Sequence, residues 1–99
     1  MRFKVNLDVF NGAIFFFIGK DEKEKYMKAS GAKDLGEATG QTHANAIWLE
    51  DKDDLETLVH EIYHAKHFMV ELLNINDEET EACILSYVFR EAMRKLKKC

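Results

Sequence analysis

The chain has 99 residues, the size of one small domain. Hydrophobic residues make up 46% of it, so a packed core is expected and disorder is not. With 14 basic and 18 acidic residues the net charge is −4, which argues against a nucleic-acid partner. The longest apolar run, 13–18, is too short for a membrane span or a signal peptide, so we expect a cytoplasmic protein without membrane contact. Two cysteines, Cys83 and Cys99, do not make a disulfide framework, and reduced thiols are expected.

The N-terminal part of the chain predicts two paired strands. Residues 2–10 alternate between apolar and polar side chains, which is typical of a half-buried strand. Asn11-Gly12 then predicts a hairpin turn. The run 13–18 is apolar on both faces, which predicts a central strand covered by helices.

The middle of the chain predicts one short helix and a second pair of strands. Residues 21–30 are charged and contain good helix formers, so we expect a short exposed helix that Gly31 ends. Residues 46–49 read as a strand. Residues 39–42 can pair with it across a turn at 43–45.

Two long helices are predicted in the second half, from about 53 to 73 and from about 77 to 97. The segment 74–76 separates them. Asn76 is predicted to cap the second helix, with Glu79 three residues later as in a capping box. Together these elements predict an α+β fold, with a short antiparallel or mixed sheet packed on the two helices.

The first long helix contains the pentapeptide His60-Glu61-Ile62-Tyr63-His64. Two histidines four residues apart on a helix lie one turn apart on the same face, so they can share one tetrahedral metal ion. Glu61 beside them can act on a metal-bound water, as in the HExxH arrangement of zinc metallopeptidases. On a helical wheel both histidines lie opposite a broad apolar stripe. The stripe consists of Leu55, Leu58, Val59, Ile62, Ala65, Met69 and Leu72.

A catalytic zinc site needs a third protein ligand, for which the second helix offers three glutamates. By helical phase, Glu78 and Glu81 fall on its apolar face, whereas Glu79 points away. A carboxylate on an apolar face is costly unless it is paired or ligated. Glu78 lies in the first turn, where the helix dipole stabilises it. Glu81 lies a full turn inside the helix and is therefore the predicted ligand, with Glu78 and then Glu79 as alternatives.

The run 57–65, with a later helix carrying Glu81, resembles the minimal gluzincin-type zinc metallopeptidases. It is especially similar to small zincin-like proteins of phage and prophage genomes. The resemblance implies a zincin-like domain, in which one helix supplies both histidines and the general base and a following helix supplies a glutamate. It also implies that the strand before the active-site helix, 46–49, forms the edge along which a peptide lies. Gluzincins commonly carry Asp or Asn four residues after the ligand glutamate, where this chain has Leu85.

The sequence gives weaker evidence that other polar side chains bind the metal or the substrate. The longer metzincin motif is excluded because its glycine and third histidine positions hold His67 and Val70. His67 lies about 10 Å along the helix axis from His60, too far for one ion to reach both easily. His43 lies in a predicted turn and carries no further signal. Tyr63, His67 and Tyr87 are candidates for stabilising an oxyanion by their chemistry alone.

The sequence therefore predicts a zinc-dependent hydrolase acting on a peptide or protein substrate. Zn²⁺ would be held by His60, His64 and Glu81, and Glu61 would be the general base. An alternative is a zincin-like protein that keeps the metal site but acts by docking onto a host or phage protein. A third reading is a structural helix pair without metal.

Overall fold

The computed structural model describes residues 1–33, 36 and 38–98, and it contains one four-stranded mixed sheet and three α-helices. The strand order is β1-β2-β4-β3, in which β2 and β4 are parallel and the two outer pairs are antiparallel. The predicted α+β fold with a mixed sheet is confirmed. In chain order the elements are β1 (Arg2–Leu7), η1 (Asp8–Phe10), β2 (Gly12–Ile18), η2 (Lys20–Glu22), α1 (Lys23–Ser30), β3 (Gly40–His43), β4 (Ala46–Leu49), α2 (Leu55–Leu72) and α3 (Glu78–Lys97).

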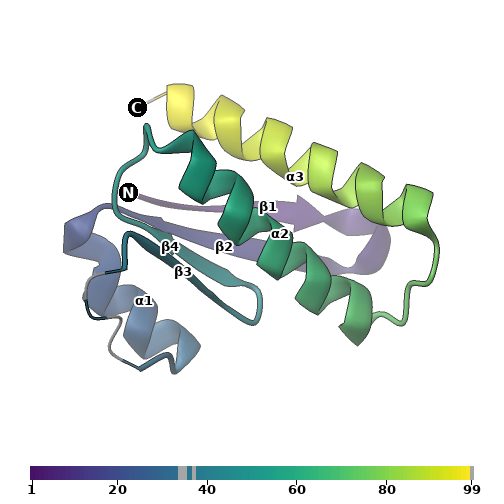
Figure 1. The fold of residues 1–99 in the computed structure, drawn as a ribbon, viewed down its shortest axis with the longest axis horizontal. Helices are drawn as coiled ribbons and strands as arrows, with labels where there is room; N and C mark the ends of the chain where they lie inside the picture. The colour runs from purple at the N-terminus through teal and green to yellow at the C-terminus, as the bar shows by residue number, and fades with distance from the viewer. Residues whose placement is uncertain (34–35, 37, 99) are drawn as a thin grey trace.

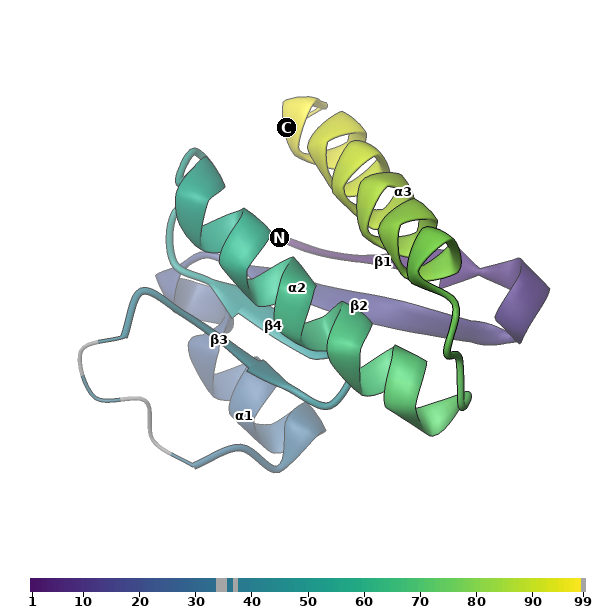
Figure 2. The ribbon, with the colours of Figure 1, turned by 45° about the vertical axis from the view of Figure 1, so that its right-hand side comes forward.

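Three layers build the molecule, with α2 and α3 on one face of the sheet and the short α1 on the other (Figures 1 and 2). The main core lies between the sheet and the two long helices. It includes Ile14, Ile47, Leu58, Ile62 and Val88, each of which is fully buried. A smaller core beneath α1 consists of Phe17, Tyr26, Ala46 and Trp48.

The first hairpin follows from the alternation of β1. Val5 and Leu7 are buried, whereas Lys4 and Asn6 are exposed. The strands pair antiparallel as predicted, but β1 ends at Leu7 and the 3-10 turn η1 replaces the tight two-residue turn. Asn11 ends η1 with a φ of 54°, a left-handed conformation that asparagine tolerates.

The prediction that residues 46–49 form the edge next to the active-site helix is wrong. β4 is an interior strand, and β3 is the outer strand on that side of the sheet. The physical reason is burial: all four residues of β4 are buried between the helical layers, whereas β3 contains Gln41, Thr42 and His43 and tolerates an edge.

An aspartate occupies the N-cap position of each long helix. Asp54 precedes α2 and accepts hydrogen bonds from the Thr57 amide (3.1 Å) and the Thr57 hydroxyl (2.6 Å), which lower the pKa of its carboxyl group. The predicted cap at Asn76 is wrong, because Asp77 occupies the N-cap of α3. Asp77 accepts a hydrogen bond from the Thr80 hydroxyl at 2.6 Å, and this bond lowers its pKa.

The buried face of α2 includes fewer residues than the predicted apolar stripe. Leu58, Ile62, Ala65 and Met69 are buried, but the stripe members Leu55, Val59 and Leu72 are 44%, 45% and 66% exposed. In the described part of the chain, no helix combines the length and apolar character needed to cross a membrane.

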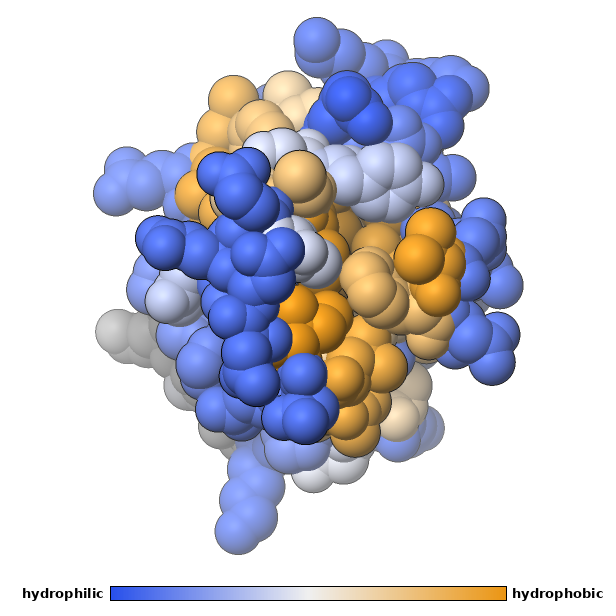
Figure 3. Space-filling model, turned by 90° about the vertical axis from the view of Figure 1, so that its right-hand side faces the viewer, coloured by the Kyte–Doolittle hydropathy of each residue, from blue (hydrophilic) through white to orange (hydrophobic). Residues whose placement is uncertain are grey.

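Apolar side chains also gather at the end of the molecule where η1 and the α2–α3 connection lie (Figure 3). Val9 of η1 is 90% exposed there. Cys83 is a free thiol, and its exposure was not predicted; Cys99 lies outside the described residues.

Candidate metal centre

His60 and His64 lie one turn apart on the exposed side of α2, and their Nε2 atoms are 3.1 Å apart. Two imidazole nitrogens that bind one tetrahedral zinc ion at about 2.0–2.1 Å lie about 3.3 Å from each other. The observed separation is that of a hydrogen bond between the two rings, and it also lies close to the spacing of two ligands of a single ion. The spacing follows from the helix itself, which places residues four apart on the same face.

Glu61 points to the sheet side of the histidine pair and is only 7% exposed. The Thr42 hydroxyl lies 2.9 Å from Oε1 of Glu61 and 2.9 Å from its main-chain carbonyl oxygen. One hydroxyl hydrogen serves both acceptors, so Thr42 fixes the carboxylate and also ties β3 to α2. The carboxylate that would act as base is thus held in place beside the histidines.

β3 reaches this position because Gly40 has no side chain. A Cβ atom at Gly40 would lie 2.6 Å from Cγ2 of Thr57 and 3.3 Å from Cγ of Glu61. Since carbon atoms in contact normally lie about 3.5–4.0 Å apart, any larger residue would push the strand away from the helix.

A cavity of about 340 Å³ lies between β3 and α2. The strand side contributes residues 40–42 and Ala44 to its walls, and α2 contributes His60, Glu61, His64 and Phe68. The two histidines, the anchored carboxylate and an outer strand of the sheet therefore meet in one hollow that is open to solvent.

The structure does not bring Glu81 together with the two histidines. Oε1 of Glu81 lies 3.5 Å from Nζ of Lys66, a buried lysine whose ammonium group also lies 4.3 Å from the centre of the Tyr63 ring. Glu78 and Glu79 are exposed in the first turn of α3. Among the described residues, no group of three or more His, Cys, Asp or Glu side chains is placed to hold a metal ion. Ligation by Glu81 stays a prediction.

The remaining candidates occupy different places. His67 is exposed, pairs with Glu71 at 3.0 Å and stacks on Tyr63. The Tyr63 ring also meets His64 edge to face, with 6.2 Å between the ring centres. Tyr87 lines a different cavity, between η1 and α3. His43 is the exposed last residue of β3.

Sequence reasoning missed Thr42 and Gly40. Both lie on the helix-facing side of β3, since alternate residues of a strand share a face. Gln41 points the other way and accepts a hydrogen bond of 2.8 Å from the Tyr26 hydroxyl. The predicted strand over 39–42 already implied that residues 40 and 42 share one face. It did not predict that this face meets α2, which only the structure shows.

Comparison of the chain with known protein families, with curated proteins and with solved structures finds no match.

Proposed function

We propose that the protein is a zinc-dependent peptide hydrolase of the zincin type. One observation carries the proposal: the Nε2 atoms of His60 and His64 are 3.1 Å apart beside a glutamate that Thr42 holds in place. Zinc is the metal that such an imidazole pair suits, and imidazole is a common zinc ligand. A zinc ion, when bound, activates a water molecule and polarises the carbonyl group of a peptide bond.

The chain's own residues would handle the proton. Oε1 of Glu61 accepts the hydrogen bond from Thr42. We assign Oε2 to take the proton from the attacking water, after which Glu61 delivers it to the leaving nitrogen. The low exposure of Glu61 keeps the carboxylate in one orientation while the histidine side of the cavity stays open to a substrate.

A third protein ligand would come from Glu81 only after its ion pair with Lys66 opens. This ion pair favours a second candidate function, a zincin-like metal-binding protein with little or no turnover that acts by docking to a host or phage protein. The Lys66 side chain is 8% exposed and the Glu81 side chain 30%, so Glu81 supplies the countercharge of a nearly buried ammonium group, which would lose it if Glu81 turned to a metal.

A Glu61→Gln variant separates the two functions. It keeps the size and most of the hydrogen bonding of Glu61 but removes the base. We expect zinc content to stay unchanged, while hydrolysis of a degenerate peptide mixture, followed by mass spectrometry, falls by about 10²- to 10⁴-fold.

The matched control is Glu56→Gln, which changes an exposed glutamate in the first turn of the same helix and should leave the cleavage rate unchanged. Cleavage by Glu61→Gln at the parent rate would refute the assignment of the base. A zinc-loaded parent protein that cleaves no peptide would favour docking instead.

A further inference from the structure

The face of the sheet opposite to α2 is covered by α1 over only part of its width (Figures 1 and 2). Phe17 and Trp48 pack against Tyr26 of α1 and are buried. Phe15 lies two residues before Phe17 on the same face of β2, yet it is 42% exposed. An aromatic ring therefore remains open to solvent in the middle of a strand.

Three cations line the same cavity as this ring. In the β1–β2 pairing Lys4 lies opposite Phe15 and Arg2 lies opposite Phe17, so these side chains project to the same face. Lys25 of α1 joins them around a cavity of about 440 Å³. Among the described residues that line this cavity, none carries a carboxylate.

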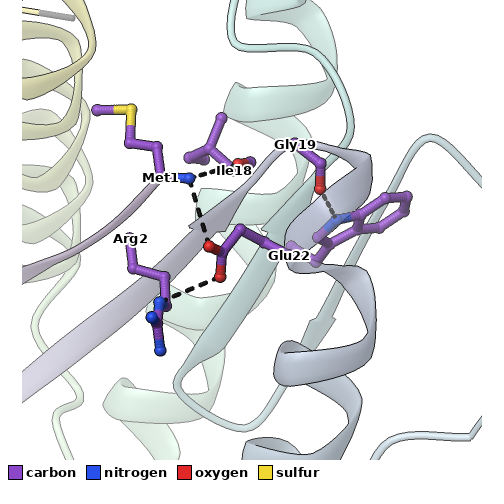
Figure 4. A network of polar contacts seen from close by, with 6 residues as sticks. Met1, Arg2, Ile18, Gly19 and Glu22 are labelled. Atoms are coloured by element: carbon purple, nitrogen blue, oxygen red, sulfur yellow. Dashed lines mark hydrogen bonds and ion pairs between the residues drawn. The ribbon is translucent and has the colours of Figure 1, made fainter.

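Arg2 keeps part of its guanidinium group available. Its Nε lies 3.1 Å from the buried carboxylate of Glu22, while the rest of the group points away from Glu22 (Figure 4). The Arg2 side chain is 55% exposed. Glu22 also lies 3.5 Å from the Met1 amino group. The charge of Glu22 is therefore already shared between two cations.

We propose that Phe15, Arg2, Lys4 and Lys25, here termed the Phe15 face, bind an acidic polypeptide segment that places one apolar side chain against Phe15. Charge complementarity points to an acidic partner: the chain has a net charge of −4, but the charged side chains among the described residues that line this cavity are all cations. The exposed ring gives the site an apolar centre with a charged rim, as in protein interfaces.

The outer edge of β1 favours a polypeptide over a nucleic acid. Within residues 1–33, 36 and 38–98, no strand pairs with β1 on the side away from β2. An extended segment can add to such an edge through main-chain hydrogen bonds, while its alternate side chains reach the face of the sheet. A nucleic acid cannot use the edge of a strand in this way, because it has no main-chain N–H and C=O groups that would continue the sheet.

The Phe15 face includes Lys25 of α1, whereas His60 and His64 belong to α2, and these two helices lie on opposite faces of the sheet (Figures 1 and 2). We therefore expect this binding to be independent of metal and turnover. The probe is a fluorescein-labelled ten-residue peptide of alternating glutamate and leucine, measured by fluorescence anisotropy at low salt. We expect saturable binding that weakens as salt is raised, because exposed charges are screened. Lys4→Glu/Lys25→Glu should lower the affinity by about tenfold or more, since two attractions become repulsions.

The matched control is Lys97→Glu/Lys98→Glu, which makes the same change in net charge at the exposed end of α3 and should bind like the parent. Thermal melting of each variant identifies any loss of fold.

Phe15→Ser provides a second test, and it should weaken binding without affecting the salt dependence. The proposal is overturned if the glutamate peptide does not bind, if a lysine-leucine peptide binds equally well, or if both double variants lose affinity alike. Tighter binding of a ten-nucleotide oligothymidylate would instead assign the face to single-stranded nucleic acid.

Discussion

Tyr26 is the buried residue that links α1 to the strand at the candidate site. Its hydroxyl donates to Gln41 of β3, next to the Thr42 that holds Glu61. Burial raises the pKa of Tyr26 to about 12; a hydrogen bond with Ser30 opposes this effect and the charge of Glu61 adds to it. A neutral phenol is therefore part of the folded state.

This shift predicts a loss of stability at high pH. Between pH 10 and about 12 the unfolded chain releases the Tyr26 proton while the folded chain keeps it, so the free energy of unfolding falls as pH rises. The contribution is fully present below pH 10 and decreases by up to about 2 to 3 kcal/mol through this window. Urea denaturation at several pH values checks it. Tyr26→Phe should lose about 1 kcal/mol at neutral pH and show a shallower decline; an identical decline in both proteins would contradict the assignment.

The sequence predicted contacts within the site only between residues that are close together along the chain. His60 and His64 were predicted to lie together because four residues of one helix fix their spacing. Thr42 could not be predicted in the same way, since it meets Glu61 across nineteen positions of sequence. Glu81 shows the same limit. Its helical phase predicted that it lies on the apolar face of α3, but it could not predict that the neighbouring side chain on α2 is Lys66 and not the histidine pair.

At the level of elements, the close approach of β3 to α2 depends on Gly40. Gly40→Ala places a methyl group 2.6 Å from Thr57 Cγ2, so the strand or the helix must move. We expect a loss of about 1–3 kcal/mol in the free energy of unfolding and a lower rate of peptide hydrolysis, because Thr42 moves with the strand.

Gly12→Ala is the control for this change, because the one close contact of its Cβ would be with the flexible end of Met69, at 2.9 Å, while the main-chain oxygen of Phe10 lies at an ordinary 4.0 Å. Chemical denaturation of both variants provides the comparison, and the Gly12 variant should lose clearly less stability. Equal stability of Gly40→Ala and the parent would show that β3 does not need to approach α2 so closely.

Within the described residues, the sequence patterns located the four strands and the three α-helices, because these patterns are local properties, but they did not predict the 3-10 turns η1 and η2. They did not predict the order of the strands. The parallel pairing of β2 with β4 joins segments separated by α1 and β3, and it is this pairing that moves β4 inside and leaves β3 at the edge. The cap of α3 was missed by one residue for a smaller reason, since Asn76 and Asp77 are both good caps.

At the scale of the whole molecule, the sheet separates two surfaces. The cavity with His60, Glu61 and His64 lies on the α2 side, and the Phe15 face lies on the side that α1 partly covers. Each surface includes or adjoins an outer strand, β3 in the first case and β1 in the second. Loss of one activity is therefore expected to leave the other intact.

Zinc-dependent thermal stability, measured on protein without a histidine tag, tests the central claim most directly. A ligand that binds only the folded state at a free concentration one hundred times its Kd stabilises it by about 2.7 kcal/mol, which raises the Tm of a domain this size by about 10–20 °C. The account predicts this rise for the parent and for His67→Asn, which removes an exposed histidine one turn further along α2. It predicts no rise for His60→Asn/His64→Asn. A parent protein whose Tm does not respond to zinc, or a double variant that responds as the parent does, would contradict it.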